Sequence, residues 1–168
     1  GKPFAALDAL VDWLPANLPQ DDAQLSIAHG DFRLGNLLFH PTRPEVTGIL
    51  DWELSTLGHP LADLGFCCMP WHTSPSEYGG ILGLDWQALG IPLQARFADH
   101  YFAHARPTAP LLPFHIVFAL FRFAVIFVGI ADRARAGNAA GADAQNVAPL
   151  AGRFAERALE IIKGKHIL

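Results

Sequence analysis

The spacing of apolar and polar positions predicts that most of the chain is helical. Residues 4–18 show the i, i+3, i+4, i+7 spacing of an amphipathic helix. The apolar side chains at these positions are Leu7, Leu10, Val11 and Leu14. Four further segments with apolar periodicity are predicted to be helices, and they cover residues 60–69, 92–105, 111–136 and 148–163. Loops are expected at residues 78–90 and 137–141, which are rich in glycine.

Two short apolar runs after the first helix are predicted to pair as a hairpin. Residues 36–40 (NLLFH) and 46–50 (VTGIL) each have the character of a strand, and the prolines between them suit a turn better than a central strand. A shorter apolar run at residues 25–28 leads into a polar loop. Antiparallel pairing brings the residues near Asn36 and Asp51 to the same end of the ribbon.

The composition is that of a globular domain. The chain has 168 residues, of which 51% are hydrophobic and 17% charged, so it can bury a substantial core and disorder is not expected. We therefore expect one α+β domain over residues 1–168, mostly helical with a small β-hairpin. The net charge of −4 argues against a nucleic-acid or anionic-membrane partner, which would need clustered Lys and Arg. Since no signal-peptide pattern opens the sequence, the expected location is cytoplasmic.

The long apolar segment 111–131 allows two interpretations. It is about long enough to cross a bilayer. It also contains Pro113, His115 and Arg122, and an arginine in the middle of a membrane helix is costly. A buried core helix is the preferred interpretation.

The polar loop and the residue after the second strand carry the candidate chemistry. In the loop HGDFRLGN, Asp31 and Asn36 have the spacing of the Asp and Asn in kinase catalytic loops, and Asp51 follows the second strand. Phosphoryl transfer from ATP to an alcohol needs a carboxylate that orients the hydroxyl, and oxygen ligands that hold Mg²⁺ against the phosphates. Together the three residues predict such a phosphotransferase. Taken alone, an Asp-x4-Asn pair is common, and Asp51 could instead be a helix N-cap.

These motifs resemble the aminoglycoside phosphotransferase family, whose kinase-like fold is shared with choline kinases. HGDFRLGN is similar to the catalytic loop of that family, and ILDWE, at residues 49–53, is similar to its metal-binding segment. The continuation LSTLGHPLADLG, at residues 54–65, resembles a narrower branch that includes kinase-like domains associated with acyl-CoA dehydrogenases. The resemblance implies the C-terminal, catalytic lobe of a protein-kinase-like fold, with ATP and Mg²⁺ as cofactors.

The resemblance also implies a role for each residue that matches the motifs. Asp31 would be the catalytic base or would orient the acceptor hydroxyl, while Asn36 and Asp51 would bind Mg²⁺. Arg33 has two possible roles, either stabilising charge on the transferred phosphate or forming a surface salt bridge.

Four further residues around the motifs are expected to support the site, and the role of a fifth is open. Leu38 and Leu50 would form the apolar floor under the adenine, and ordinary core packing is compatible with that role. His29 would brace the loop through a hydrogen bond, with a proton shuttle as the less favoured alternative, and Asp63 would hold the loop backbone as a buried polar anchor. Glu53 is ambiguous, because it could lie near the metal or pair with a neighbouring cation.

The resemblance further implies a part of the kinase that this chain is expected to lack. A complete kinase has an amino-terminal lobe with a phosphate-covering loop, a strand Lys and its partner Glu. Only 28 residues precede His29, and they are predicted to be one helix and one short run. We therefore expect a fragment whose partner is the missing amino-terminal lobe and which transfers phosphate poorly alone.

The acceptor is expected to be a small-molecule alcohol. The residues after 85 are rich in aromatics and poor in acids, which favours an acceptor less cationic than an aminoglycoside. The narrower branch suggests a hydroxyacyl-CoA, and an aminoglycoside-like alcohol remains possible. One alternative is a catalytically silent nucleotide- or ligand-binding module. Another, a metal-dependent hydrolase, would need further ligands around Asp51 that the sequence does not offer.

Overall fold

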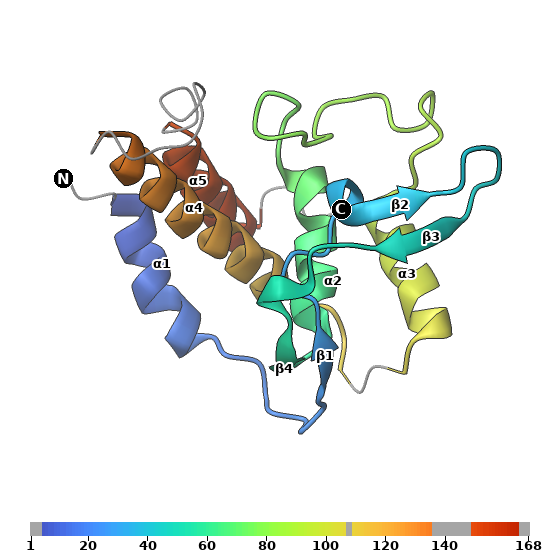
Figure 1. Cartoon of the computed structure of the whole chain (residues 1–168). Helices are drawn as coiled ribbons and strands as arrows, with labels where there is room; N and C mark the ends of the chain where they lie inside the picture. Colours follow the sequence, from blue (N-terminus) through green and yellow to red (C-terminus); the bar gives the residue numbers. More distant parts are fainter. Residues whose placement is uncertain (1–4, 107–108, 136–148, 165–168) are drawn as a thin grey trace.

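The computed structural model describes residues 5–106, 109–135 and 149–164. Within these ranges the chain forms five α-helices, two antiparallel pairs of strands and three short 3₁₀ helices (Figure 1). The α-helices are α1 (Ala5–Ala16), α2 (Leu61–Cys68), α3 (Gln94–His104), α4 (Pro113–Arg135) and α5 (Leu150–Ile162). All five predicted helices are therefore present, and residues 78–90 are a loop as expected. The loop predicted at residues 137–141 lies outside the described residues.

Helix α4 forms the centre of the core. It packs against α5, α2 and α1, and α1 also packs on α5. Val117, Leu120 and Ala124 on α4 are completely buried. The stretch Pro113–Arg133 is long and apolar enough to cross a membrane, but half of its most apolar window is buried inside the described structure. This burial agrees with the interpretation of the segment as a core helix. Figure 1 shows α1, α4 and α5 gathered on one side of the molecule, with α2 next to them.

The apolar stripe of α1 is narrower than its sequence pattern predicts. Leu10 and Leu14 are buried, and Leu7 is partly buried against the core. Val11 was expected on the same face but is 56% exposed. At 3.6 residues per turn, Val11 lies about 100° around the helix from Leu10, at the edge of the stripe that faces α4 and α5.

Helices α2 and α4 approach each other closely at Gly65. A Cβ atom at this position would lie 2.6 Å from the carbonyl carbon and oxygen of His115. Real Cβ atoms do not come this close to backbone, so the contact requires glycine. The close contact presses α2 against the start of α4, and α2 carries Asp63.

The predicted hairpin is present. Strands β2 (Leu37–Phe39) and β3 (Val46–Ile49) pair in antiparallel register. At the end of the ribbon, the backbone N–H of Leu50 donates to the carbonyl oxygen of Asn36 at 2.8 Å. This bond places the backbone of Asn36 beside the residue that precedes Asp51, as the antiparallel pairing predicted.

A second ribbon was not predicted. Strand β1 (Ser26–Ala28) pairs antiparallel with β4 (Thr56–Gly58), and Ile27 lies opposite Leu57. The sequence indicated only an apolar run at the first of these positions, because a three-residue strand is too short to show alternation. Since β1 leads directly into the polar loop and β4 leads into α2, their pairing sets that loop beside α2.

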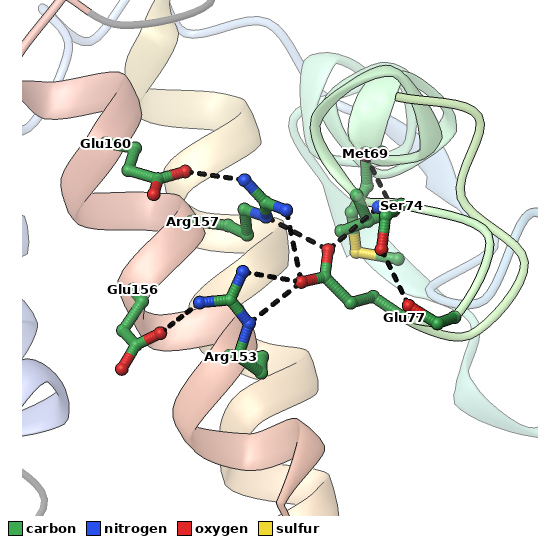
Figure 2. A network of polar contacts seen from close by, with 9 residues as sticks. Met69, Ser74, Glu77, Arg153, Glu156, Arg157 and Glu160 are labelled. Atoms are coloured by element: carbon green, nitrogen blue, oxygen red, sulfur yellow. Dashed lines mark hydrogen bonds and ion pairs between the residues drawn. The ribbon is translucent and has the colours of Figure 1, made fainter. Parts of the chain in front are cut away.

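The loop between α2 and α3 is anchored to α5 through Glu77 (Figure 2). Its buried carboxylate accepts hydrogen bonds from Nε of Arg153 at 2.9 Å, and from Nε and Nη2 of Arg157 at 3.0 and 3.1 Å. The backbone N–H of Ser74 also donates to this carboxylate, at 2.8 Å. The next residue, Tyr78, packs its ring on aromatic side chains of α4. A loop that the sequence indicated only by its glycines is therefore tied firmly to the helical body.

Candidate active site

Asp31 and Asn36 are joined by hydrogen bonds. Asp31 lies in the turn that precedes the 3₁₀ helix Leu34–Asn36. The side-chain amide nitrogen of Asn36 donates to Oδ2 of Asp31 at 2.8 Å and to its carbonyl oxygen at 2.9 Å. Asn36 is only 6% exposed, so these bonds are sheltered from water. Because the amide nitrogen makes both bonds, the amide oxygen is the atom of Asn36 that remains to bind a ligand.

Arg33 lies beside the same carboxylate. Its Nε donates to Oδ1 and Oδ2 of Asp31 at 3.3 and 3.2 Å. Both side chains are partly exposed, so the ion pair contributes about 1 kcal/mol or less to stability. The salt bridge that was one of two alternatives for Arg33 is therefore present, and its partner is Asp31. A role of Arg33 at the transferred phosphate stays a prediction.

His29 connects the polar loop to the end of β3. The ring is buried, with Nε2 at 2.8 Å from the carbonyl oxygen of Leu50 and Nδ1 accepting the backbone N–H of Asp31 at 3.2 Å. Since Nδ1 accepts a hydrogen bond, Nε2 must carry the proton that is donated to Leu50. One imidazole thereby fixes the backbone of Asp31 relative to the residue that precedes Asp51.

Helix α2 holds the polar loop from the other side. Oδ2 of Asp63 accepts the backbone N–H of His29 at 2.5 Å, and Oδ1 accepts that of Gly30 at 2.9 Å. One turn further along α2, the thiol of Cys67 donates to the carbonyl oxygen of Phe32 at 3.3 Å. Burial raises the pKa of Cys67 to about 12, so the thiol stays protonated and acts as a hydrogen-bond donor. Helix α2 therefore fixes the loop backbone at three points.

Asp51 presents an exposed carboxylate at the end of β3. Its φ and ψ are 68° and 52°, in the left-handed region that Asp adopts more readily than most residues. Such backbone conformations cost energy and cluster at functional sites. Its side chain makes no cap hydrogen bond to the following 3₁₀ helix Trp52–Leu54, so the N-cap alternative is not supported. Within the described ranges, this carboxylate has no hydrogen-bonding or ion-pair partner.

The donor atoms at this end of the hairpin fit Mg²⁺. The carboxylate of Asp51 and the amide oxygen of Asn36 are hard oxygen ligands, and Mg²⁺ is commonly bound by one or two protein groups together with substrate phosphates. Glu53 is exposed nearby and has no ion-pair partner in the part of the chain that the structure describes. The described residues contain no group of three or more His, Cys, Asp or Glu side chains that could hold a metal ion.

Leu38 and Leu50 lie on the surface of the hairpin. They are 49% and 45% exposed, so they do not pack in the core. The alternative of ordinary core packing is therefore wrong for the described structure, in which no layer of the described residues covers these side chains. Their role under an adenine stays a prediction.

The structure adds a residue that the sequence did not assign to the site. Nη2 of Arg122, on α4, donates to the carbonyl oxygen of Gly30 at 2.9 Å. In the sequence, Arg122 indicated only that α4 is a poor membrane helix. Its partner is 92 positions away, so no local pattern could have revealed the contact.

A cavity of about 300 Å³ lies next to the polar loop. Its lining includes Phe32, Trp52 and Asp63, together with Phe97 and Tyr101 of α3. Aromatic residues of α3 and residues of the polar loop therefore line the same cavity. The predicted catalytic and metal-binding side chains are not part of this lining.

The hairpin, the Asp31–Asn36 pair and the helical body have the arrangement expected of a kinase-like fold. The sequence model of the phosphotransferase enzyme family matches residues 2–112, which is more than half of the chain. The chain therefore belongs to the phosphotransferase enzyme family, and its α+β, kinase-like fold is as predicted.

Known proteins support this assignment. A crystal structure described as that of "a putative aminoglycoside phosphotransferase" from Ralstonia eutropha JMP134 matches with a TM-score of 0.89 and 45% identity. That match covers 97% of this chain and 50% of the other. Acyl-CoA dehydrogenase family member 10 of Mus musculus is 38% identical over 157 residues, covering 91% of this chain and 14% of that protein. The probable acyl-CoA dehydrogenase IBR3 of Arabidopsis thaliana is 36% identical, over 95% of this chain and 20% of that protein.

These comparisons confirm both levels of the resemblance seen in the sequence. The aminoglycoside phosphotransferase-like family is confirmed by the family match and the solved structure, and the narrower branch by the acyl-CoA dehydrogenase relatives. This chain spans half of the solved structure and about a fifth or less of the curated relatives. The expectation of a missing amino-terminal lobe stays a prediction.

Proposed function

We propose that this chain provides the acid–base and metal-binding residues of an ATP-dependent phosphotransferase that acts on the hydroxyl of a small molecule. The observation that carries the proposal is the geometry at the end of the hairpin. The carboxylate of Asp31 is held by the buried amide of Asn36, while the carboxylate of Asp51 is exposed and partnerless among the described residues.

Asp31 is the group that orients the acceptor hydroxyl and accepts its proton. The hydrogen bond from Asn36 and the ion pair with Arg33 fix the direction of the carboxylate, and its partial exposure leaves it accessible. The guanidinium of Arg33 would also attract phosphate oxygens. Asn36 and Asp51 would hold Mg²⁺, which would neutralise charge on the phosphates of ATP when bound.

The amino-terminal lobe of the parent protein would cover exposed apolar side chains of the two ribbons. Single chains rarely expose large contiguous apolar areas unless a partner or ligand binds there. Large apolar side chains exposed along these ribbons include Ile27, Leu38, Phe39, Leu50 and Leu57. Of these side chains, Leu38 and Leu50 would lie under the adenine of ATP.

The acceptor class that we propose is a hydroxyacyl thioester, such as a hydroxyacyl-CoA. Two of the relatives are named as acyl-CoA dehydrogenases, and a kinase domain joined to such an enzyme would phosphorylate an acyl group that carries a hydroxyl. Fold alone does not fix the substrate, so aminoglycosides form the comparison set in the test.

A turnover assay on the full-length parent protein tests the proposal. ADP release with Mg·ATP would be measured against a panel of hydroxyacyl-CoAs and aminoglycosides. We expect Asp31→Ala to lower kcat by about 10²–10⁴-fold, the usual contribution of a general base, with ATP affinity nearly unchanged. Asp12→Ala, an exposed change on α1, is the matched control and should behave as wild type. ATP binding without turnover for any alcohol would instead identify a silent binding module.

A further inference from the structure

The peptide unit between Gly30 and Asp31 is held at both of its polar atoms. The carbonyl oxygen of Gly30 accepts a hydrogen bond from Nη2 of Arg122 at 2.9 Å. The N–H of Asp31 donates to Nδ1 of His29 at 3.2 Å. Because a peptide unit is planar, two bonds on opposite edges fix the orientation of its plane. This plane sets the direction in which the Asp31 side chain leaves the backbone.

This peptide needs external support, because the residue before it is glycine. Gly30 has a φ of +84°, and a glycine can adopt either sign of φ at little cost. The peptide that follows can therefore rotate unless other groups hold it. A residue with a restricted backbone cannot replace the glycine, since a Cβ would lie 2.6 Å from the carbonyl oxygen of Leu54. The rigidity of the loop must come from its hydrogen-bonding partners.

Arg122 is well placed to supply that rigidity. It belongs to α4, the central helix of the core, and it is only partly exposed. Its guanidinium carbon lies 5.9 Å from the centre of the Phe118 ring, one helical turn earlier, so the side chain is supported by its own helix. In the described ranges Arg122 has no carboxylate partner, and it donates there to the carbonyl oxygen of Gly30. Gly30 is also held at its N–H, which donates a hydrogen bond to Oδ1 of Asp63.

We propose that Arg122 is a positioning residue for Asp31. By holding the Gly30 carbonyl, it keeps the following peptide in one orientation, so that the Asp31 carboxylate stays on the amide of Asn36. His29 holds the same peptide from its N–H edge, and among the described residues only Arg122 links it to α4. The consequence for turnover rests on the proposed function, whereas the consequence for backbone rigidity does not.

Three variants of the full-length parent protein test this assignment. Arg122→Met removes the donor and keeps most of the aliphatic stem. Arg122→Lys keeps a positively charged donor but replaces the planar, forked guanidinium by a single ammonium group. Arg133→Met is the matched control, because Arg133 is an exposed arginine on the same helix. Each variant is compared by hydrogen exchange over residues 29–36, by thermal denaturation, and by steady-state kinetics.

Arg122→Met is expected to speed exchange of the Asp31 amide by about tenfold, as the loss of one charge-assisted hydrogen bond predicts. Exchange within α4 should not change. The kcat should fall by a similar factor while KM for ATP stays within about twofold, since Asp31 and not the nucleotide site is displaced. Arg122→Lys should recover part of both losses, and Arg133→Met should match wild type.

Unchanged exchange over residues 29–36 in Arg122→Met would overturn the assignment, whether or not the parent protein turns over a substrate. A uniform rise in exchange that includes α4, with no recovery in Arg122→Lys, would also overturn it, because it would show a role in overall stability only. A parent without phosphotransferase activity would defeat the proposed function, but the exchange measurement would still decide the role of Arg122.

Discussion

Replacing Glu77 by Gln tests how strongly a buried carboxylate ties the loop after α2 to α5. Glu77 is only 5% exposed and receives hydrogen bonds from Arg153, Arg157 and the backbone of Ser74 (Figure 2). Burial alone would raise the pKa of Glu77. The hydrogen bonds from Arg157, Ser74 and Arg153, with the charge of Arg157, outweigh burial and lower the pKa from 4.5 to about 2.

Because the pKa of Glu77 is lower in the folded than in the unfolded state, the ionised carboxylate stabilises the folded protein. A pKa that falls from 4.5 to about 2 corresponds to about 3 kcal/mol in the free energy of unfolding, at about 1.4 kcal/mol per pH unit. Because the folded-state pKa is the lower one, this stability is present above pH 4.5 and is lost as the pH falls towards 2. Glutamine keeps the shape but not the charge. Glu77→Gln should therefore be about 3 kcal/mol less stable than wild type near neutral pH, and the difference should disappear near pH 2.

Urea denaturation followed by tryptophan fluorescence measures this difference between about pH 3 and pH 7. Glu156→Gln is the control, since Glu156 also pairs with Arg153 but its side chain is 53% exposed. An exposed pair is worth at most about 1 kcal/mol, so the control should show a small effect with little pH dependence. The reasoning fails if Glu77→Gln is no more destabilising than Glu156→Gln, or if its effect is the same at pH 3 and pH 5.

Two more predictions concern packing and the metal ligands. Gly65→Ala should lower the free energy of unfolding by about 1–3 kcal/mol, because its Cβ would collide with the backbone of His115. Gly152→Ala on α5, where a Cβ meets nothing within 4 Å, should be neutral or stabilising by up to about 1 kcal/mol in the same thermal denaturation assay. Asp51→Asn in the full-length protein should weaken Mn²⁺ binding measured with ATP by at least about tenfold, because even groups that only hydrogen-bond to a metal ligand are worth roughly 10–100-fold. Its melting temperature should stay unchanged, and unaltered Mn²⁺ affinity would exclude Asp51 as a ligand.

The motifs and helices that could be predicted are those whose pattern lies within a short stretch of the sequence. Asp31 and Asn36 are five positions apart and Asp51 follows one hairpin later, so spacing and antiparallel pairing sufficed to bring them to one end of the ribbon. The long helices were predicted because their apolar periodicity extends over several turns. The catalytic and metal-binding roles stay predictions.

The contacts that hold the site could not be predicted, because they join distant parts of the chain. Arg122 reaches Gly30 across 92 positions, and Arg153 reaches Glu77 across 76. Arg153 has the local pattern of an arginine that faces water, and Arg122, although it stands in an apolar helix, has no local pattern that identifies its partner. Strand β4 was missed for a related reason, since three residues gain their strand character only from pairing with β1. The exposure of Val11 likewise depends on how wide a face α4 and α5 offer to α1.

The packing of α1 on α5 has a consequence for how the chain is made on the ribosome. Phe154 and Ala158 of α5 are completely buried, so the core closes only after this last described helix has been synthesised. The polar loop and α2 are complete by residue 68, and α5 ends at residue 162. At about 5–20 residues per second, roughly 5–20 s of synthesis separate the two events. Through that interval the nascent chain already carries the proposed catalytic residues, while the apolar faces of α1 and α4 are not yet covered by α5.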